Sequence, residues 1–517
     1  MDRNSRIFNS FRNARVAVVF YFINLLIQFF YRKIFLNHLG SEVLGLNTTA
    51  MNLLQFLNIA ELGVGAAVSY SLYSPLSKKD HASINEIISV QGYLYTRIGV
   101  VVMVAGLILM LFFPMIFSDM SIPMWYAYST FGVLFLSSLS SYFFSYQQIL
   151  FISDQKEYQL NYILQGAKFL KIVLQLISIN FFSHGYIFWI FWELLSIIVI
   201  TWGINYKLNK EYSWLDVSYI KGKAALAKHS EITLKTKQLF AHKLAGFALT
   251  EVTPLVIFAF TNLSFVAKYG NYLLVIAGVT ALLGAIFNSV NASVGNLVSE
   301  GNSLKIEAIF EELFTVRFLL AVISCYSIYK LTPIFITLWL GTNYLLDPSV
   351  LLLLVILMFI NITRLTVDSF LNAYGLFKDI FAPILELILN VSLSISLGKF
   401  FGVKGVLAGV ILSNILIVLC WKPFFLFRNG IKTNPVKYFQ MYFKQVLVSV
   451  LVITICEYAI SYLSFTSNIS LVNFITFGFL VAVTITLLMI LSFSLLTKGL
   501  PLFITRLKKI IIAKQPA

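Results

Sequence analysis

The chain has 517 residues, of which 59% are hydrophobic and only 12% are Asp, Glu, Lys or Arg. A typical soluble domain carries about 25% charged residues, and no soluble fold of this length can bury so much apolar surface. Because one bilayer span needs about 20 mostly apolar residues, the chain has material for roughly a dozen spans or more. The composition predicts an all-α, polytopic membrane protein and excludes a disordered chain, a collagen and a disulfide scaffold.

Hydropathy along the chain predicts fourteen transmembrane helices. Their expected ranges are 16–36, 44–72, 87–117, 125–152, 160–182, 186–206, 241–262, 271–298, 313–338, 349–374, 380–401, 404–427, 441–465 and 470–496. Four arginines precede the first range, but no small-residue cleavage pattern follows it, so we expect this segment to stay as a helix rather than to act as a cleaved signal peptide.

The net charge of +16 indicates membrane topology rather than nucleic-acid binding. Most Lys and Arg residues lie in the N-terminus, in alternate loops and in the C-terminal tail. The excess of basic residues on cytoplasmic loops therefore predicts that both termini are cytoplasmic. The longest connection, 207–240, is the most basic, and it is expected to orient the protein against anionic lipid headgroups rather than to bind a specific partner.

This connection divides the chain into an N-terminal lobe of six helices (1–206), a basic linker (207–240), a second six-helix lobe (241–428) and two further helices with a basic tail (429–517). The lobes resemble copies. The segment from Asp80 to Arg97 aligns without gaps with that from Glu300 to Arg317 at an offset of 220. Six spans return the chain to its starting side, so the two lobes are expected to be parallel repeats.

The sequence lacks the common motifs of enzymes. It has no nucleotide-binding glycine loop, no zinc-binding pair of histidines, no nucleophile elbow and no cysteine spacing for a metal. Its five histidines lie near span ends or in loops. We therefore expect a protein that is not an enzyme and that has no cofactor, metal or nucleic-acid partner.

Polar and charged residues at membrane depth are costly and mark functional positions. The clearest series lies in the tenth span, at steps of three or four residues, which places its members on one helical face. Similar series occur in the fifth and first spans. The three series are Asn361, Arg364, Asp368 and Asn372; Asn161, Gln165, Lys168 and Gln175 with Lys171 close by; and Asn24, Gln28 and Arg32. Such faces are expected to line a water-filled cavity.

The candidate substrate-binding residues are the basic members of these series. Lys168, Lys171 and Arg364 are expected to line the cavity, although an ion pair or anchor that is purely structural is the alternative. Arg97 and Arg317 stand about ten and four residues inside the cytoplasmic starts of their spans, so each could serve the substrate or extend its side chain to the interface as an anchor.

Acidic residues at membrane depth are candidates for ion coupling or ion pairing. Asp368 lies one helical turn from Arg364 and is its expected partner. Glu251 precedes Pro254, a site where a membrane helix bends, and it is a candidate for proton or ion coupling or for a packing role. Glu61 in the second span is the third candidate.

The N-terminal part resembles bacterial polysaccharide flippases of the O-antigen type, which belong to the multidrug/oligosaccharidyl-lipid/polysaccharide exporter superfamily. The similarity covers about residues 10–100 and rests on FLNHLGSEVLGLN (35–47), LLQFLNIAELGVGAAV (53–68) and YSLYSPL (70–76). The rest of the chain agrees in span count and repeat layout. Members of this superfamily have two six-helix lobes around a central cavity, and the lipid II flippase has fourteen helices.

The resemblance implies a flippase in the bacterial cytoplasmic membrane that moves an undecaprenyl-diphosphate-linked oligosaccharide, a polysaccharide repeat unit, to the outer leaflet by alternating access. It also implies membrane lipids and polysaccharide polymerase machinery as partners. The residues agree, because an anionic headgroup needs an aqueous cavity with fixed positive charge. Two alternatives remain. A cation-coupled drug exporter of the same superfamily would need an acidic cavity, and a polysaccharide polymerase or ligase would need a substantial external loop.

Overall fold

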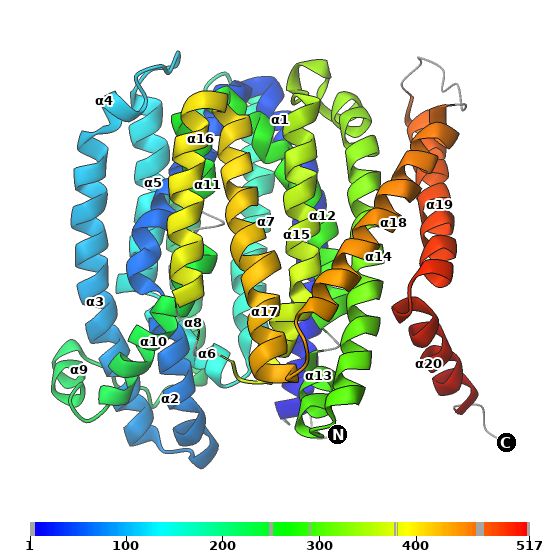
Figure 1. Ribbon diagram of the computed structural model, residues 1–517. Coiled ribbons are helices and arrows are strands. Elements are labelled where there is room, and N and C mark those ends of the chain that lie inside the picture. Colours follow the sequence, from blue (N-terminus) through cyan, green and yellow to red (C-terminus); the bar gives the residue numbers. More distant parts are fainter. Residues whose placement is uncertain are drawn as a thin grey trace. The chain divides into compact units, whose positions relative to one another are not determined.

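The computed structural model describes residues 6–247, 252–288, 291–376, 379, 381–461 and 470–513, which form helices and turns without any strand (Figure 1). This confirms the predicted all-α class. Contacts divide the chain into two compact units, Met1–Ala267 and Lys268–Ala517. The predicted domain ranges and the internal repeat remain predictions.

Within the described ranges, nine helices are long and apolar enough to cross a bilayer. The protein is therefore a multi-pass membrane protein. Two of these helices, α1 (Arg6–Leu57) and α16 (Phe381–Asn414), each run through one predicted span and into the first part of the next. In both, one glycine interrupts the helical backbone: Gly40 has φ 81° and Gly402 has φ 57°, values that side chains with a Cβ rarely adopt. The predicted number of fourteen spans stays a prediction.

The first unit contains α1 and ten further helices. These are α2 (Val64–Lys78), α3 (His81–Leu111), α4 (Phe113–Ile116), α5 (Trp125–Phe143), α6 (Ile149–Ser153), α7 (Glu157–Phe181), α8 (Gly185–Glu211), α9 (Tyr219–Ala225), α10 (Ser230–Phe247) and α11 (Thr253–Ala259), with 3₁₀ turns at Asn58–Glu61 and Tyr146–Gln148. The core lies between α2, α3, α5 and α6, where Leu72, Phe131, Tyr142 and Phe151 are fully buried. Helix α7 packs against α8 and α1.

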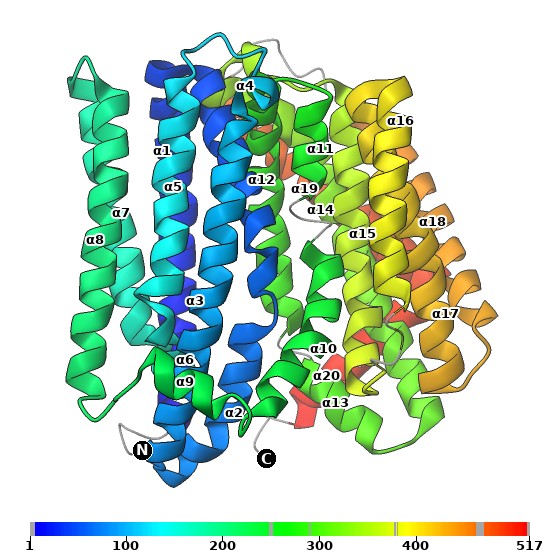
Figure 2. The ribbon, with the colours of Figure 1, turned by 90° about the vertical axis from the view of Figure 1, so that its left-hand side faces the viewer.

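The basic linker is folded and packs against α3 (Figure 2). A Cβ on Gly222 of α9 would lie 2.0 Å from the backbone oxygen of Ser89, so only glycine permits this approach. Lys228 and His229 bind Glu86 of α3 at 2.7 and 3.0 Å, and His81 stacks on Trp214 at 3.8 Å. Part of the linker charge is thus used within the protein.

The second unit begins within α12 (Leu263–Asn288) and contains α16 and seven further helices. These are α13 (Asn291–Ser299), α14 (Ser303–Leu340), α15 (Pro348–Ala373), α17 (Lys422–Leu426), α18 (Val436–Ser461), α19 (Leu471–Leu496) and α20 (Gly499–Ala513), with a 3₁₀ turn at Thr342–Tyr344 and π-helical segments at Ile415–Trp421 and Phe427–Ile431. The long α14 is the centre of the core. Its Phe310, Phe314 and Phe318 pack against Tyr438 of α18 and Phe493 of α19.

The two halves of α16 pack against each other on either side of Gly402. The Ser394 hydroxyl donates to the Val406 carbonyl at 3.1 Å, and the Asn390 amide donates to Ser413 at 3.5 Å. A Cβ on Gly409 would lie 2.4 Å from the Ser394 backbone nitrogen. This close hairpin places Glu386 and the segment before Lys422 beside α15.

Candidate substrate-binding clusters

A charged cluster joins α7 to α8 in the first unit. The Lys171 ammonium lies 2.9 Å from Oε2 of Glu193, and the side chains of this pair are 20% and 11% exposed. The Gln175 amide donates to Oε1 of Glu193 at 3.1 Å and to the Trp189 carbonyl at 3.2 Å. Both carboxylate oxygens therefore have partners. We call Lys168, Lys171, Gln175 and Glu193 the α7 cluster.

Lys168 differs from Lys171 although it lies only three residues away on α7. Its side chain is half-buried, and within the described ranges it has neither an ion-pair partner nor a hydrogen bond. The α7 cluster thus holds two ammonium groups and one carboxylate. An ammonium at membrane depth that lacks a counter-charge requires water or an incoming anion.

Helix α1 supplies the polar residues that fix α7 and α8 in place. The Asn24 amide donates to Gln165 of α7 at 2.8 Å, and the Trp189 indole of α8 donates to the Tyr31 hydroxyl at 2.7 Å. The predicted polar faces of the first and fifth spans therefore meet in part. Gln28 remains exposed.

A second charged cluster lies between α15, α16 and α17. Arg364 and Asp368 form the predicted ion pair at 3.1 Å, and each side chain is about a quarter exposed. Lys422 lies 3.7 Å from Asp368 and 3.7 Å from Glu386, whose side chain is 2% exposed. The Oε1 atom of Glu386 is buried and has no hydrogen-bond partner among the described residues. Lys422 therefore bridges two carboxylates that come from different helices.

Arg317 of α14 adds a third cation to this region. It is buried, and its guanidinium donates to the Thr366 hydroxyl at 3.4 Å and to the Phe287 carbonyl at 3.3 Å. It also lies over the Phe287 ring at 4.6 Å. Thr366 precedes Asp368 by two residues. The α15 cluster, defined as Arg317, Arg364, Asp368, Glu386 and Lys422, thus holds three cations and two carboxylates.

Two other candidates, Arg97 and Glu61, lie outside the two clusters. Arg97 is exposed and covers the ring of Tyr93, one turn earlier on α3, at 4.8 Å. Glu61, at the end of a 3₁₀ turn, accepts a hydrogen bond from the Tyr95 hydroxyl at 2.8 Å. Glu251 lies outside the described residues.

Sequence reasoning missed three members of the clusters as site residues. Glu193 and Glu386 stand out as acids at membrane depth, but their cation partners come from other helices or from distant positions in the sequence. Lys422 lies at the end of a predicted span, so its charge is assigned from the sequence to the adjacent cytoplasmic loop. The available signal in the sequence was an acidic residue at membrane depth, because a carboxylate that is buried there requires a cation or a donor.

An apolar groove of about 380 Å³ also lies in the second unit. Its walls come from α14, α15 and α18, and they include Phe318, Val322, Val355, Phe359 and Val450. Most of the remaining lining is aliphatic or aromatic, and the charged member Glu457 pairs with Lys330 at 2.5 Å. A groove with such walls fits a hydrocarbon chain.

No family model and no curated protein matches the sequence. The structure is similar to that of the lipid II flippase MurJ in an inward closed conformation, with a TM-score of 0.63 and 14% identity over 92% of this chain and 98% of that chain. An inward-facing multidrug resistance MATE family transporter of the MOP superfamily matches with a TM-score of 0.55 and 14% identity, over 76% of this chain and 92% of its own.

A third similar structure is a MOP superfamily transporter from Pyrococcus furiosus, with a TM-score of 0.51 and 14% identity over 83% of this chain and 97% of its own. That protein is described as having a binding pocket of reverse polarity, which suggests a different function for it. At such low identities, similarity establishes the fold alone. The chain therefore has the fold shared by the lipid II flippase MurJ and the MATE transporters of the MOP superfamily.

Proposed function

We propose that the protein is a flippase of the bacterial cytoplasmic membrane, which moves an undecaprenyl-diphosphate-linked oligosaccharide to the outer leaflet by alternating access. One observation carries this proposal. Each unit holds a cluster within predicted spans that has one more cation than carboxylates: two against one in the α7 cluster, and three against two in the α15 cluster.

The excess positive charge suits an anionic headgroup. Each phosphate of a diphosphate diester carries a negative charge, and in a site with little water such a charge is stable only beside fixed cations or donors. Lys168, which has no ion-pair partner in the described structure, is available to contact a phosphate directly. Arg364 and Lys422 are paired with carboxylates, so their positive charges attract a phosphate less strongly than that of Lys168 does.

The apolar groove supports a substrate with a long hydrocarbon chain. Its lining from α14, α15 and α18 can hold a prenyl tail, while the hydrated headgroup stays near the charged clusters. A water-soluble sugar or a small cationic drug would gain little from this groove.

A cation-coupled drug exporter is the main alternative, because MATE transporters share the fold. A cationic drug would need a site with excess negative charge, whereas both clusters have excess positive charge. The Pyrococcus furiosus protein, with its binding pocket of reverse polarity, supports the use of charge rather than fold to choose between such functions. A polysaccharide polymerase or ligase is the other alternative, and no observation favours it.

The proposal is tested by deleting the gene and locating lipid-linked repeat units in the two leaflets. We expect the units to accumulate on the cytoplasmic leaflet and the surface polysaccharide to disappear. Wild-type protein should restore the polysaccharide, as should a Lys33→Met control, because Lys33 is exposed on α1. Accumulation on the outer leaflet would instead support a polymerase or ligase.

A further inference from the structure

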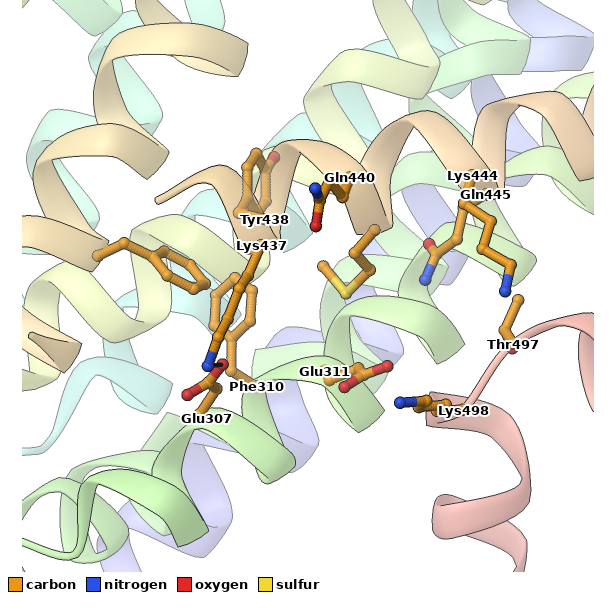
Figure 3. A pocket seen from close by; sticks show the side chains of 12 residues that line it. Glu307, Phe310, Glu311, Lys437, Tyr438, Gln440, Lys444, Gln445, Thr497 and Lys498 are labelled. Atoms are coloured by element: carbon orange, nitrogen blue, oxygen red, sulfur yellow. Dashed lines mark hydrogen bonds and ion pairs between the residues drawn. The ribbon is translucent and has the colours of Figure 1, made fainter. Parts of the chain in front are cut away.

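A second cavity lies in the second unit between the first turns of α14, the first half of α18 and the turn between α19 and α20, and its lining includes none of the residues of the α7 and α15 clusters (Figure 3). Its volume is about 430 Å³. Unlike the apolar groove, it has a mixed lining of charged, polar and aromatic side chains. We call it the α14–α18 cleft.

The charged groups of this cleft are only partly paired. Lys437 and Glu307 form an ion pair at 2.7 Å. Lys444, Lys498 and Glu311 also line the cleft, and in the described part of the chain none of the three has an ion-pair partner or a side-chain hydrogen bond. Two ammonium groups and one carboxylate thus remain, which leaves a surplus of one positive charge.

A buried polar group on the wall of the cleft also lacks a partner. Gln445 is 1% exposed, and its amide nitrogen donates to the Thr315 hydroxyl at 2.8 Å. Its Oε1 atom is buried and accepts no hydrogen bond within the described structure. Because leaving a buried acceptor unpaired is costly, this oxygen is available to accept a hydrogen bond from a ligand hydroxyl.

The wall formed by Thr497 and Lys498, directly before α20, is fixed in position. A Cβ on Gly499 would lie 2.2 Å from the Thr315 hydroxyl, so the start of α20 lies directly against α14. Arg506 also binds the buried Glu312 at 3.0 Å. The cleft is therefore a built cavity rather than a gap between loosely placed helices.

The surroundings of the cleft indicate its depth in the membrane. The predicted topology places the start of α14 and the basic tail at the cytoplasmic interface. Exposed apolar side chains lie close by in sequence: Phe443 precedes Lys444, and Leu495 and Leu496 precede Lys498. A ligand here would have its charged part in the cleft and apolar parts against these side chains.

We propose that the α14–α18 cleft binds the headgroup of an anionic glycerophospholipid of the cytoplasmic leaflet, with the phosphodiester between Lys444 and Lys498 and the headgroup hydroxyls donating to Glu311 and Gln445. The surplus of one positive charge matches a phosphodiester that carries one negative charge. A headgroup with its own ammonium has no net charge and fits less well. This site is separate from that of the proposed flippase function.

The purified full chain in detergent, titrated with dioctanoyl phosphatidylglycerol and followed by native mass spectrometry, tests the proposal. We expect saturable binding of one lipid that is about 10-fold tighter than binding of dioctanoyl phosphatidylethanolamine, the effect of one net charge with its hydrogen bonds. Neither inorganic phosphate nor glycerol 3-phosphate at the same concentration should displace the lipid. Equal binding of the two lipids, or complete displacement by inorganic phosphate, would overturn the proposal.

Variants locate the site. A Lys444→Gln/Lys498→Gln double variant should lose about 10-fold or more in affinity for phosphatidylglycerol. Lys210→Gln/Lys223→Gln removes the same charge from exposed positions of the first unit and should bind as the wild type does. Gln445→Leu, which removes the buried acceptor at similar volume, should reduce affinity without the change in charge. Unchanged binding by folded Lys444→Gln/Lys498→Gln protein, monitored by gel filtration, would contradict the proposal.

Discussion

Two lysines of α7 illustrate how neighbouring residues of one type differ in role. Lys171 is paired with Glu193 at 2.9 Å, whereas Lys168 has no ion-pair partner among the described residues. From the sequence, both belong to one polar face. The difference depends on the position of Glu193 on α8, 22 residues after Lys171, and on the tertiary contact between the helices. No local pattern could distinguish them.

Substitution by Met separates these roles. Lys168→Met should leave the free energy of unfolding within about 0.5 kcal/mol of the wild type, because no pair is lost, but should slow translocation about 10-fold. Lys171→Met should cost about 1–3 kcal/mol of stability, because Glu193 keeps its charge without its cation. Denaturant unfolding in detergent and a translocation assay measure the two effects. A strongly destabilised Lys168→Met protein with normal transport would contradict the assignment.

The α15 cluster shows what the sequence could and could not predict at residue scale. The pairing of Arg364 with Asp368 followed from their spacing of four residues, and the structure shows it. The bridge from Lys422 to Glu386 did not, because it depends on the hairpin of α16 and on the π-helical segment before Lys422. Neither feature has a reliable signature in a single sequence.

At the scale of elements, helix ends refine the proposed internal repeat. Asp80 caps α3 by accepting from the Ser83 backbone at 3.1 Å, and Asn302 caps α14 by accepting from the Lys305 backbone at 3.1 Å. These caps lie 222 positions apart, not at the offset of 220 that matches Arg97 to Arg317. The same offset of 222 relates Lys156 to Lys378 in the sequence. Pairing Arg97 with Arg317 therefore gives a different register from pairing the helix starts.

The hairpin of α16 provides a test of packing. Gly409→Ala should destabilise the protein by about 1–3 kcal/mol, because the new Cβ would lie 2.4 Å from the Ser394 backbone and the halves must separate. Gly284→Ala is the matched control in α12, where nothing lies within 4 Å of the new Cβ. It should be neutral or stabilising by up to about 1 kcal/mol. Equal unfolding midpoints for the two variants would contradict the close packing described for α16.

Docking of the linker on α3 should depend on pH. Hydrogen bonds from Lys228 and then from His229 lower the pKa of Glu86 below its usual value. Because the pKa is lowered in the folded state, Glu86 contributes to docking above its ordinary pKa of about 4.3, and this contribution is lost as the pH falls through the lowered value. Glu231, 3.5 Å from His229, is a further charged group here, and Asp80 also interacts electrostatically with Lys228.

Hydrogen exchange of amides in 219–232, corrected for intrinsic rates, measures this docking. We expect protection to stay constant from pH 7 to about pH 5 and to decrease below about pH 4. Glu86→Gln should show reduced protection at neutral pH. If the Glu86→Gln protein is protected as strongly as the wild type, Gly222 and the aromatic contacts hold the linker without the ion pairs.

For the whole molecule, composition and hydropathy were sufficient to predict an all-helical membrane protein, because these properties follow from the bilayer rather than from specific partners. The fold is shared with MurJ at 14% identity. The substrate is harder to predict, because its binding depends on the few charged side chains that remain unpaired after folding. Here that balance is one excess cation in each charged cluster, and the proposed function depends on it.

The most direct measurement of this account is translocation in proteoliposomes that contain the purified full chain and a fluorescent undecaprenyl-diphosphate oligosaccharide, followed by the headgroup fraction accessible to an added impermeant quencher. We predict transfer between leaflets well above that of protein-free liposomes, about 10-fold slower transfer for Lys168→Met, and normal transfer for Lys33→Met. No transfer above protein-free liposomes with correctly folded protein, or equal rates for all three proteins, would contradict the account.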